Sequence, residues 1–208
     1  PFQRLVNQGM ITSFAYQRSN KTLVPTDEVV QNEDGTFTEK ATGEKLEQVV
    51  AKMSKSLKNV VNPDEEIKKY GADSVRMYEM FMGPLTMSKP WNTQGIIGIN
   101  RFLEKVWSVS EKPVNNTDIR GKISDKALVS ARKTYAQTVK KVTDDTANLS
   151  FNTAISQMMI FINEVSKLDA LPREMWEGFV KMLACYAPHL GEELWQKLGH
   201  DRSEERRV

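Results

Sequence analysis

The chain has 208 residues, with 29 basic and 27 acidic side chains, a formal net charge of +2 and 39% hydrophobic residues. These proportions fit one globular domain or two small ones and exclude a wholly disordered chain. No apolar stretch approaches the length of a membrane span, the first residues do not resemble a signal peptide, and the single Cys185 cannot form an internal disulfide. We therefore expect a cytoplasmic protein with no membrane contact.

Basic residues are concentrated in the middle of the chain. Residues 51–141 carry 17 basic and nine acidic side chains, whereas residues 1–50 carry five and seven, and residues 142–208 carry seven and eleven. A basic block between acidic ends predicts a surface for a polyanion. A set of solvated, lysine-rich helix faces explains the same charges equally well.

The chain changes character near residue 62. Before it, residues 10–16 alternate and are rich in β-forming residues, which predicts a strand. Residues 29–30 and 36–38 flank a polar segment containing Asp34-Gly35, where glycine supplies the positive φ that a hairpin turn needs. A β-hairpin is therefore expected here.

Helix signals begin after this segment. Asn62–Glu65 combines a capping residue, a proline at the first helical position and an acidic third position, which predicts a helix that ends at Gly71. Asp73 is expected to cap the next helix, and Gly83-Pro84 breaks the chain after it.

From about residue 93 the apolar residues recur at helical spacing, with helix starts predicted at Thr93, Ser124, Pro172 and Pro188. Short loops join these helices, as is typical of antiparallel neighbours. The expected fold is mainly α, an antiparallel helical bundle (residues 93–208) preceded by a small α+β segment with a β-hairpin (residues 1–92). The residues expected to face the core are Ile96, Ile99, Phe102, Leu103, Val106, Leu128, Ala131, Tyr135, Val139, Val142, Leu149, Ile155, Met158, Met159, Ile162, Val165, Phe179, Val180, Leu183, Leu190, Leu194 and Trp195.

The sharpest local signal is Lys52-Met53-Ser54-Lys55-Ser56, with more positive charge at Lys58. Lysine ammonium groups act as mobile charges on phosphate oxygens, and serine hydroxyls hydrogen-bond to the same oxygens. Because the segment directly precedes a capped helix, it is expected to be a loop. That placement suits closure over a nucleotide, whereas a solvated surface loop is the simpler interpretation of the composition alone.

The five residues Lys52–Ser56 resemble the KMSKS signature of class I aminoacyl-tRNA synthetases, and the sequence around them resembles the leucyl-tRNA synthetases of bacterial type. The valyl, isoleucyl and methionyl relatives usually differ in the block that ends at Leu85. Residues 187–195 resemble the helical anticodon-binding domain of the family. The segments that carry the resemblance are Pro1–Leu5, Gln8–Met10, Asn59–Asp64, Tyr70–Asp73, Arg76, Tyr78–Leu85, Trp91, Arg101–Leu103, Val106-Trp107 and Ala187–Trp195.

One signature of the family is missing. Class I synthetases carry His-x-Gly-His well before KMSKS, whereas the only histidines here, His189 and His200, follow it. The ATP platform, the leucine pocket and the editing domain are therefore expected to lie outside this chain. We expect a C-terminal fragment, inactive alone, in which residues 1–92 end the catalytic domain with the KMSKS loop and connecting helices, and residues 93–208 form the tRNA-contacting, anticodon-binding bundle.

The resemblance implies a leucine–tRNA ligase, which activates leucine with ATP and Mg²⁺ and transfers it to tRNA(Leu). It implies ATP contacts from Lys52, Ser54, Lys55 and Ser56, with Lys55 the first catalytic candidate and Lys52 the second. Met53 is expected to seat the loop by packing. No cofactor or metal is expected to be held by the fragment itself, and a monomer is expected.

The bundle is expected to meet tRNA phosphates through basic side chains, which gives affinity without reading the sequence. Cys185 is interpreted as a buried structural residue, and His189 as a residue of a helix start or of the core. The candidate tRNA contacts are Arg101, Lys105, Arg132, Lys133, Lys140 and Lys141.

Two alternative functions stay open. One is a standalone RNA-binding helical module that kept a synthetase-like sequence without catalysis. The other is part of a class I synthetase for valine, isoleucine or methionine. An upstream His-x-Gly-His in the same reading frame argues against the first, and leucine-dependent pyrophosphate exchange argues against the second.

Overall fold

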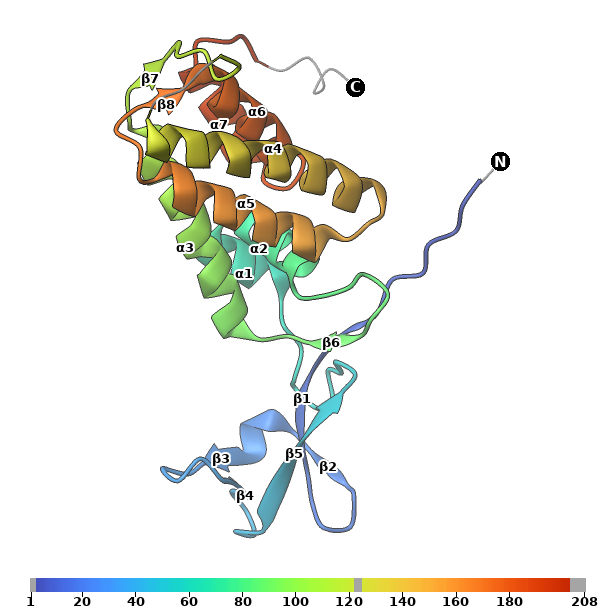
Figure 1. Cartoon of the computed structure of the whole chain (residues 1–208). Helices are drawn as coiled ribbons and strands as arrows, with labels where there is room; N and C mark the ends of the chain where they lie inside the picture. The colour runs from blue at the N-terminus through green and yellow to red at the C-terminus, as the bar shows by residue number, and fades with distance from the viewer. Residues whose placement is uncertain (1–2, 122–124, 203–208) are drawn as a thin grey trace. The chain divides into compact units, whose positions relative to one another are not determined.

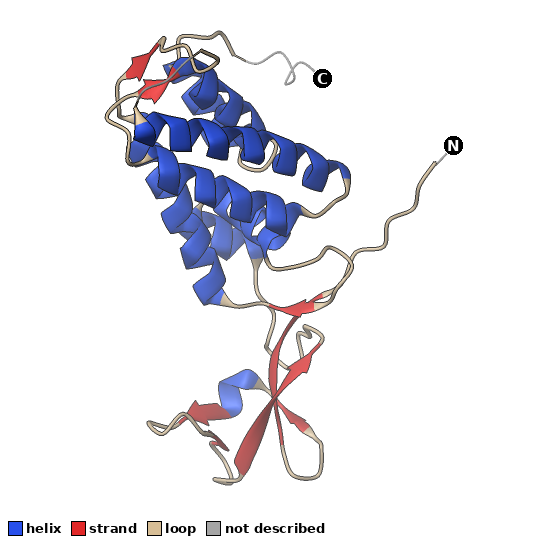
Figure 2. Ribbon diagram, in the orientation of Figure 1, coloured by secondary structure: helices blue, strands red, loops and turns tan. Residues whose placement is uncertain are grey.

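The computed structural model describes residues 3–121 and 125–202, which divide into two compact units (Figure 1). The first unit is built from the chain up to Glu66 and from Thr86–Thr93, and the second from Ile67–Leu85 and the chain from Gln94 onward. Strands dominate the first unit and helices the second, as Figure 2 shows. The predicted class, a helical bundle preceded by a small β-containing segment, is confirmed.

The first unit is a six-stranded sheet in the order β2-β1-β5-β4-β3, with β6 paired in parallel to β1. Its buried core is small and consists mainly of Ala15, Val24 and Leu46, none more than 4% exposed. Such a core leaves much of the unit's order to strand pairing and polar contacts. The strands are β1 (Ile11–Gln17), β2 (Leu23–Val24), β3 (Val29–Gln31), β4 (Phe37–Glu39), β5 (Lys45–Ala51) and β6 (Lys89–Pro90), and a 3₁₀ turn, Thr26–Glu28, precedes β3.

The hairpin between β3 and β4 forms as predicted. The two strands pair antiparallel, with Gln31 opposite Phe37 at the closing end. Gly35 has a φ of 80°, and the Asp34 carboxylate accepts a hydrogen bond from the Thr36 backbone N–H at 2.9 Å. The turn thus uses both the conformational freedom of glycine and the short acceptor side chain beside it.

The second unit is a bundle of helices, completed by a short parallel strand pair, β7 (Val114–Asn115) with β8 (Leu171–Pro172). Its most extensive helix pair is α4 with α5, which lie side by side in Figure 1. None of the helices in the described residues is long and apolar enough to cross a membrane. The helices are α1 (Pro63–Tyr70, which begins in the first unit), α2 (Ala72–Phe81), α3 (Thr93–Ser110), α4 (Lys126–Ala147), α5 (Phe151–Val165), α6 (Arg173–Ala184) and α7 (Pro188–Lys197).

Aromatic residues form the centre of the bundle. Phe161 on α5 lies 5.1 Å from Phe179 on α6, and Trp176 stacks on Phe179 with ring centroids 5.3 Å apart. All three side chains are at most 2% exposed. Tilted and stacked pairs at these distances add attraction to the burial of large apolar surfaces. The predicted stripe of α3 is also buried, at Ile96, Ile99, Phe102, Leu103 and Val106.

Helix α2 belongs to the bundle and not to the first unit. Its Val75, Met77 and Tyr78 are buried, and it packs on α5 and α7. The compact units therefore differ from a division at residue 92, because residues 67–85 bury their apolar face among the helices that follow.

The buried face of α4 differs from the expected one. Ala131 and Val142 are buried as predicted, but Thr138 is fully buried and Val139 is 38% exposed. Thr138 lies seven residues after Ala131 and on nearly the same side of the helix, whereas Val139 is turned by a further angle of about 100°. The Thr138 hydroxyl is satisfied there, because it donates to Thr134 O and accepts from Gln157 Nε2. Leu149 lies beyond the helix, with a φ of 59°.

Two predicted helix caps turn out differently. Ser124 lies outside the described residues, and the N-cap of α4 is Asp125, whose Oδ1 accepts from Ala127 N at 2.8 Å. Asp73 does not cap its own helix, which begins after Gly71. Its Oδ2 instead accepts from Leu190 N at 2.7 Å, in the first turn of α7.

This cap between helices has a clear cause. Ala187, at the N-cap of α7, has no side-chain acceptor for the free N–H groups of that helix. Asp73 Oδ1 also accepts from His189 N at 3.3 Å and lies 2.8 Å from His189 Nδ1. Its carboxylate therefore joins α2 to the start of α7, and His189 has the predicted helix-start role with its side chain 70% exposed.

The prediction that Cys185 is buried was wrong. Cys185 is exposed at the C-cap of α6, because the helix ends at Ala184 and the buried neighbours there are Leu183 and Tyr186. Close packing of α6 and α7 depends on Gly191 instead: a Cβ built there would lie 2.6 Å from Ala184 Cα.

Candidate functional site

The Lys52–Ser56 loop leaves the sheet directly at the end of β5. This strand pairs antiparallel with β1, and the last pair of the ladder is Ser13 with Ala51. Lys52 is thus the first residue beyond the ladder. The position of the loop in the first unit is therefore set by the register of two paired strands.

The loop presents its charges to solvent. Lys52 and Lys55 are exposed, and neither ammonium group has a hydrogen-bond or ion-pair partner within the described ranges. Ser54 Oγ and Ser56 Oγ lie 2.7 Å apart, within hydrogen-bond distance, and Met53 is half-buried. Two unpaired ammonium groups beside two neighbouring hydroxyls are suited to phosphate oxygens.

Lys58 is engaged and adds no free charge to the loop. Its Nζ lies 2.5 Å from Asp27 Oδ2, an exposed ion pair. The hydrogen bond raises the pKa of Lys58 and lowers the pKa of Asp27. The positive charges available to a ligand on this segment are therefore those of Lys52 and Lys55.

Sequence reasoning missed two residues that fix the base of the loop. The buried Asn59 side chain accepts a hydrogen bond from Ser54 N at 2.9 Å. Thr26 N donates to Leu57 O at 2.9 Å, and Thr26 Oγ1 donates to Lys58 O at 2.5 Å. No local pattern distinguishes a buried asparagine from an ordinary turn asparagine, and Thr26 is far away in the sequence.

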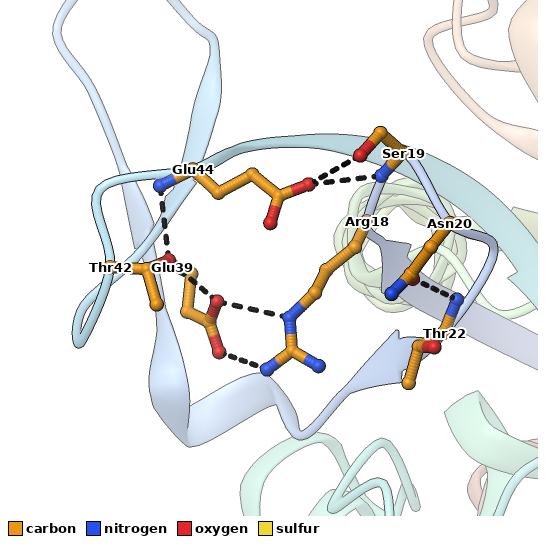
Figure 3. A network of polar contacts seen from close by, with 7 residues as sticks. All are labelled: Arg18, Ser19, Asn20, Thr22, Glu39, Thr42 and Glu44. Atoms are coloured by element: carbon orange, nitrogen blue, oxygen red, sulfur yellow. Dashed lines mark hydrogen bonds and ion pairs between the residues drawn. The ribbon is translucent and has the colours of Figure 1, made fainter.

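A polar network fixes the other end of β5 (Figure 3). Arg18 Nε donates to Glu39 Oε2 at 3.0 Å and Arg18 Nη2 donates to Oε1, a bidentate ion pair in which Glu39 is 3% exposed. Thr42 Oγ1 also donates to Glu39, at 2.7 Å. Ser19 Oγ donates to Glu44 Oε1 at 2.8 Å. The network therefore ties the β1–β2 turn to the β4–β5 turn.

These contacts shift the titration of the carboxylate. The hydrogen bond from Arg18, with a second one from Thr42, lowers the pKa of Glu39 below its ordinary value of 4.5. The same hydrogen bond raises the pKa of Arg18. The charged form of the pair is therefore favoured in the folded unit.

The six basic residues predicted to contact tRNA lie on two helices, Arg101 and Lys105 on α3 and the others on α4. Three of them already have partners: Lys105 donates to Asn163 Oδ1 at 2.6 Å, Arg132 donates to Gly121 O at 2.9 Å, and Lys141 pairs with Asp145 at 2.9 Å. The three that are exposed and unpaired in the described part of the chain are Arg101, Lys133 and Lys140.

The two histidines lie in the helical unit and pair with acidic residues. His189 contacts Asp73, and His200 Nε2 lies 2.9 Å from Glu177 Oε1. Among residues 3–121 and 125–202, no group of three or more His, Cys, Asp or Glu side chains is arranged to hold a metal ion.

Two segments of the chain match known protein families. Residues 41–89 match the class I tRNA synthetases for I, L, M and V, and residues 130–206 match the anticodon-binding domain of tRNA ligases. A solved structure, the ternary complex of Agrobacterium radiobacter K84 agnB2 LeuRS, tRNA and LeuAMS, is similar with a TM-score of 0.62 and 26% identity. The match covers 72% of this chain and 21% of that one. The chain is therefore part of a class I aminoacyl-tRNA synthetase.

Curated relatives narrow the class. The chain is 55% identical to the leucine–tRNA ligase of Treponema pallidum subsp. pallidum over 215 residues, and 54% identical to that of Borrelia turicatae over 203 residues. These matches cover 96% and 98% of this chain. The chain belongs to the leucyl-tRNA synthetase family, and it spans 24% and 23% of the length of these two relatives.

The Arg18–Glu39 pair predicts how the stability of the first unit depends on pH. Because the pKa of Glu39 is lower in the folded state than its ordinary 4.5, the pair stabilises the unit above that pH, and the contribution is lost as the pH falls through the folded value. Glu39→Gln should therefore be less stable than the wild type at neutral pH, and the difference should shrink in acid. Urea unfolding midpoints between about pH 7 and about pH 3 measure it.

Glu47→Gln is the matched control, because Glu47 is an exposed carboxylate on β5 in the same sheet. The control should follow the wild type across the whole range. If Glu39→Gln and wild type lost stability in parallel on acidification, the ion pair would not be what the sheet depends on.

Proposed function

We propose that this chain acts within a leucine–tRNA ligase, where residues 1–92 bring the KMSKS loop to ATP and residues 93–208 bring the bundle to tRNA(Leu). The observation that carries the proposal is the loop itself. Lys52 and Lys55 are exposed, without partners among the residues that the structure describes, on a segment whose base is fixed to the sheet. The sequence similarity to leucine–tRNA ligases along nearly the whole chain supports the choice of amino acid.

The chemistry accounts for lysines at this position. A leucine carboxylate oxygen attacks the α-phosphorus of ATP, the bond to the β-phosphate oxygen breaks, and leucyl-adenylate and pyrophosphate form. Negative charge accumulates on the departing pyrophosphate, and ATP would bring Mg²⁺ with its phosphates. Lys55, and secondarily Lys52, would stabilise that charge, more strongly once closure of the site excludes water. Ser54 and Ser56 would add hydrogen bonds to the same oxygens.

The second step would use the other part of the chain. A ribose hydroxyl of the terminal adenosine of tRNA attacks the leucyl carbonyl, and AMP leaves. The bundle would hold tRNA through phosphate contacts and thus contribute affinity more than sequence discrimination. We further propose that the enzyme works in the cytoplasm as a monomer, and that the 208-residue chain by itself forms no leucyl-adenylate.

Lys55→Ala in the complete enzyme tests the catalytic role. If the lysine stabilises the leaving pyrophosphate in the transition state, the adenylation rate constant should fall roughly 100-fold to 1,000-fold, with a smaller change in ATP binding. Transfer from preformed adenylate should suffer less, since pyrophosphate has already left. Pre-steady-state kinetics of the two steps measure this, and Lys52→Ala should show a smaller effect of the same kind.

Lys45→Ala is the control, because Lys45 is an exposed lysine at the start of β5, whereas the loop follows the end of that strand. It should leave both steps unchanged. If Lys55→Ala raised only the ATP Michaelis constant, the lysine would bind ATP equally well in the ground state and in the transition state. The catalytic assignment would then fail.

The interaction with tRNA should be electrostatic. Binding of tRNA(Leu) should weaken steeply with salt, and replacing Arg101, Lys133 and Lys140 by alanine should lower the slope of log K against log salt by about one for each phosphate that is no longer neutralised. Fluorescence anisotropy over a KCl series measures the slope. A tRNA(Leu) with an altered anticodon should bind almost as well.

Lys167→Ala is the control here, because Lys167 is a surface lysine already paired with Glu164 at 2.6 Å. An unchanged slope in the triple variant would exclude these residues from the tRNA surface. An affinity that depended strongly on the anticodon would contradict binding through the phosphates of the tRNA backbone.

A further inference from the structure

The Asn59 side chain connects the KMSKS loop to the sheet. It is 6% exposed, and Oδ1 accepts a hydrogen bond from Ser54 N at 2.9 Å. Nδ2 donates to Phe14 O on β1 at 3.3 Å and to Lys52 O at 3.5 Å. A buried amide requires partners for both its donor and its acceptor groups, and here it finds them on two separate segments.

These hydrogen bonds begin where strand pairing stops. The ladder between β1 and β5 ends at the Ser13–Ala51 pair, so the backbone from Lys52 onward has no strand partner in that ladder. Asn59 contacts the loop on both sides of Met53 and contacts β1 one residue after Ser13. Its amide therefore ties the loop back to β1 at Phe14, which pairs with Val50 inside the ladder.

The returning half of the loop is held separately. Lys58 N donates to Lys55 O at 3.2 Å, and Lys58 has a φ of 51°, a left-handed turn that reverses the chain. Thr26 binds the carbonyls of Leu57 and Lys58. With Asn59 on one side and Thr26 on the other, the backbone around Lys55 is restrained at both ends while its side chain stays exposed.

We infer that Asn59 is a positioning residue for adenylation, which holds Lys52 and Lys55 in register with the sheet without itself contacting ATP. The inference rests on the proposed function of the loop. The amide acts through backbone atoms, Ser54 N and Lys52 O, so it sets where the two ammonium groups are aimed and not how strongly they are charged.

The consequence is specific to the first chemical step. A misplacement of about 1 Å that starts away from the reacting atoms can cost roughly 100-fold in rate. Asn59→Ala removes the restraint on one side and leaves Thr26 on the other, so we expect adenylation to slow about 10-fold to 100-fold. Transfer of leucine from preformed adenylate to tRNA should change by less than about threefold, because it does not need the loop lysines on pyrophosphate.

The experiment compares Asn59→Ala, Asn59→Asp and Val60→Ala in the complete enzyme with leucine, ATP and tRNA(Leu). Single-turnover adenylation and transfer are measured separately, and the burst amplitude counts active sites so that each rate is per folded molecule. Asn59→Asp keeps an acceptor for Ser54 N and loses both donors, so its adenylation rate should lie between those of Asn59→Ala and the wild type. Val60 is the exposed neighbour, and its variant should match the wild type.

The outcomes separate the inference from the function on which it rests. Slow adenylation with near-normal transfer in Asn59→Ala, partly restored in Asn59→Asp, supports positioning. The inference is overturned if Asn59→Ala slows both steps equally per active site, or slows neither. If Asn59→Ala does not fold, the two rates of Asn59→Asp decide by the same criterion. An enzyme in which Lys55→Ala leaves adenylation intact would instead refute the proposed role of the loop.

Discussion

The register between β1 and β5 is the constraint on which the candidate ATP loop depends. With Ser13 opposite Ala51, Lys52 is the first residue past the ladder. A shift of one residue would turn every side chain of β5 to the other face of the sheet and displace the loop with it. The small apolar core of this unit cannot fix the register alone, so the ion pair of Arg18 with the buried Glu39 at one end and Asn59 at the other supply the rest. Such polar contacts are directional, and they select one register from several that apolar packing would tolerate.

The helical unit is organised differently because its order comes from burial. Helices α3, α5 and α6 each bury mainly aromatic and aliphatic side chains, and helix ends are satisfied by neighbours, as where Asp73 caps α7. The basic residues take no part in that interior. Arg101, Lys133 and Lys140 keep exposed, unpaired charges in the described part of the bundle, so they can bind a polyanion without disturbing the core. In the proposed function, phosphate chemistry would thus belong to the first unit and polyanion affinity to the second.

Local rules predicted the elements that local chemistry determines. Asp34-Gly35 specified a hairpin, Asn62–Glu65 a helix start, and the spacing of Ile96 to Val106 a buried stripe, all of which the structure confirms. The rules failed where a distant segment decides: Asp73 caps another helix, and the buried Thr138 finds a partner in Gln157 on α5. Of the candidate site, the sequence indicated Lys52 and Lys55 but not Asn59, whose partners lie on β1 and on the loop it closes. Burial of a polar side chain is a property of the assembled sheet, and no residue pattern encodes it.

Amino-acid-dependent exchange of pyrophosphate into ATP tests the central claim most directly. The complete protein that contains this chain should exchange pyrophosphate with leucine and much more weakly with valine, isoleucine or methionine, because the amino acid must be activated for the label to appear. The 208-residue chain measured alongside should show no exchange, since by our account it carries the loop without the platform that aligns ATP with the carboxylate. Exchange driven by another amino acid, no exchange by the complete protein, or exchange by this chain alone would each contradict the account.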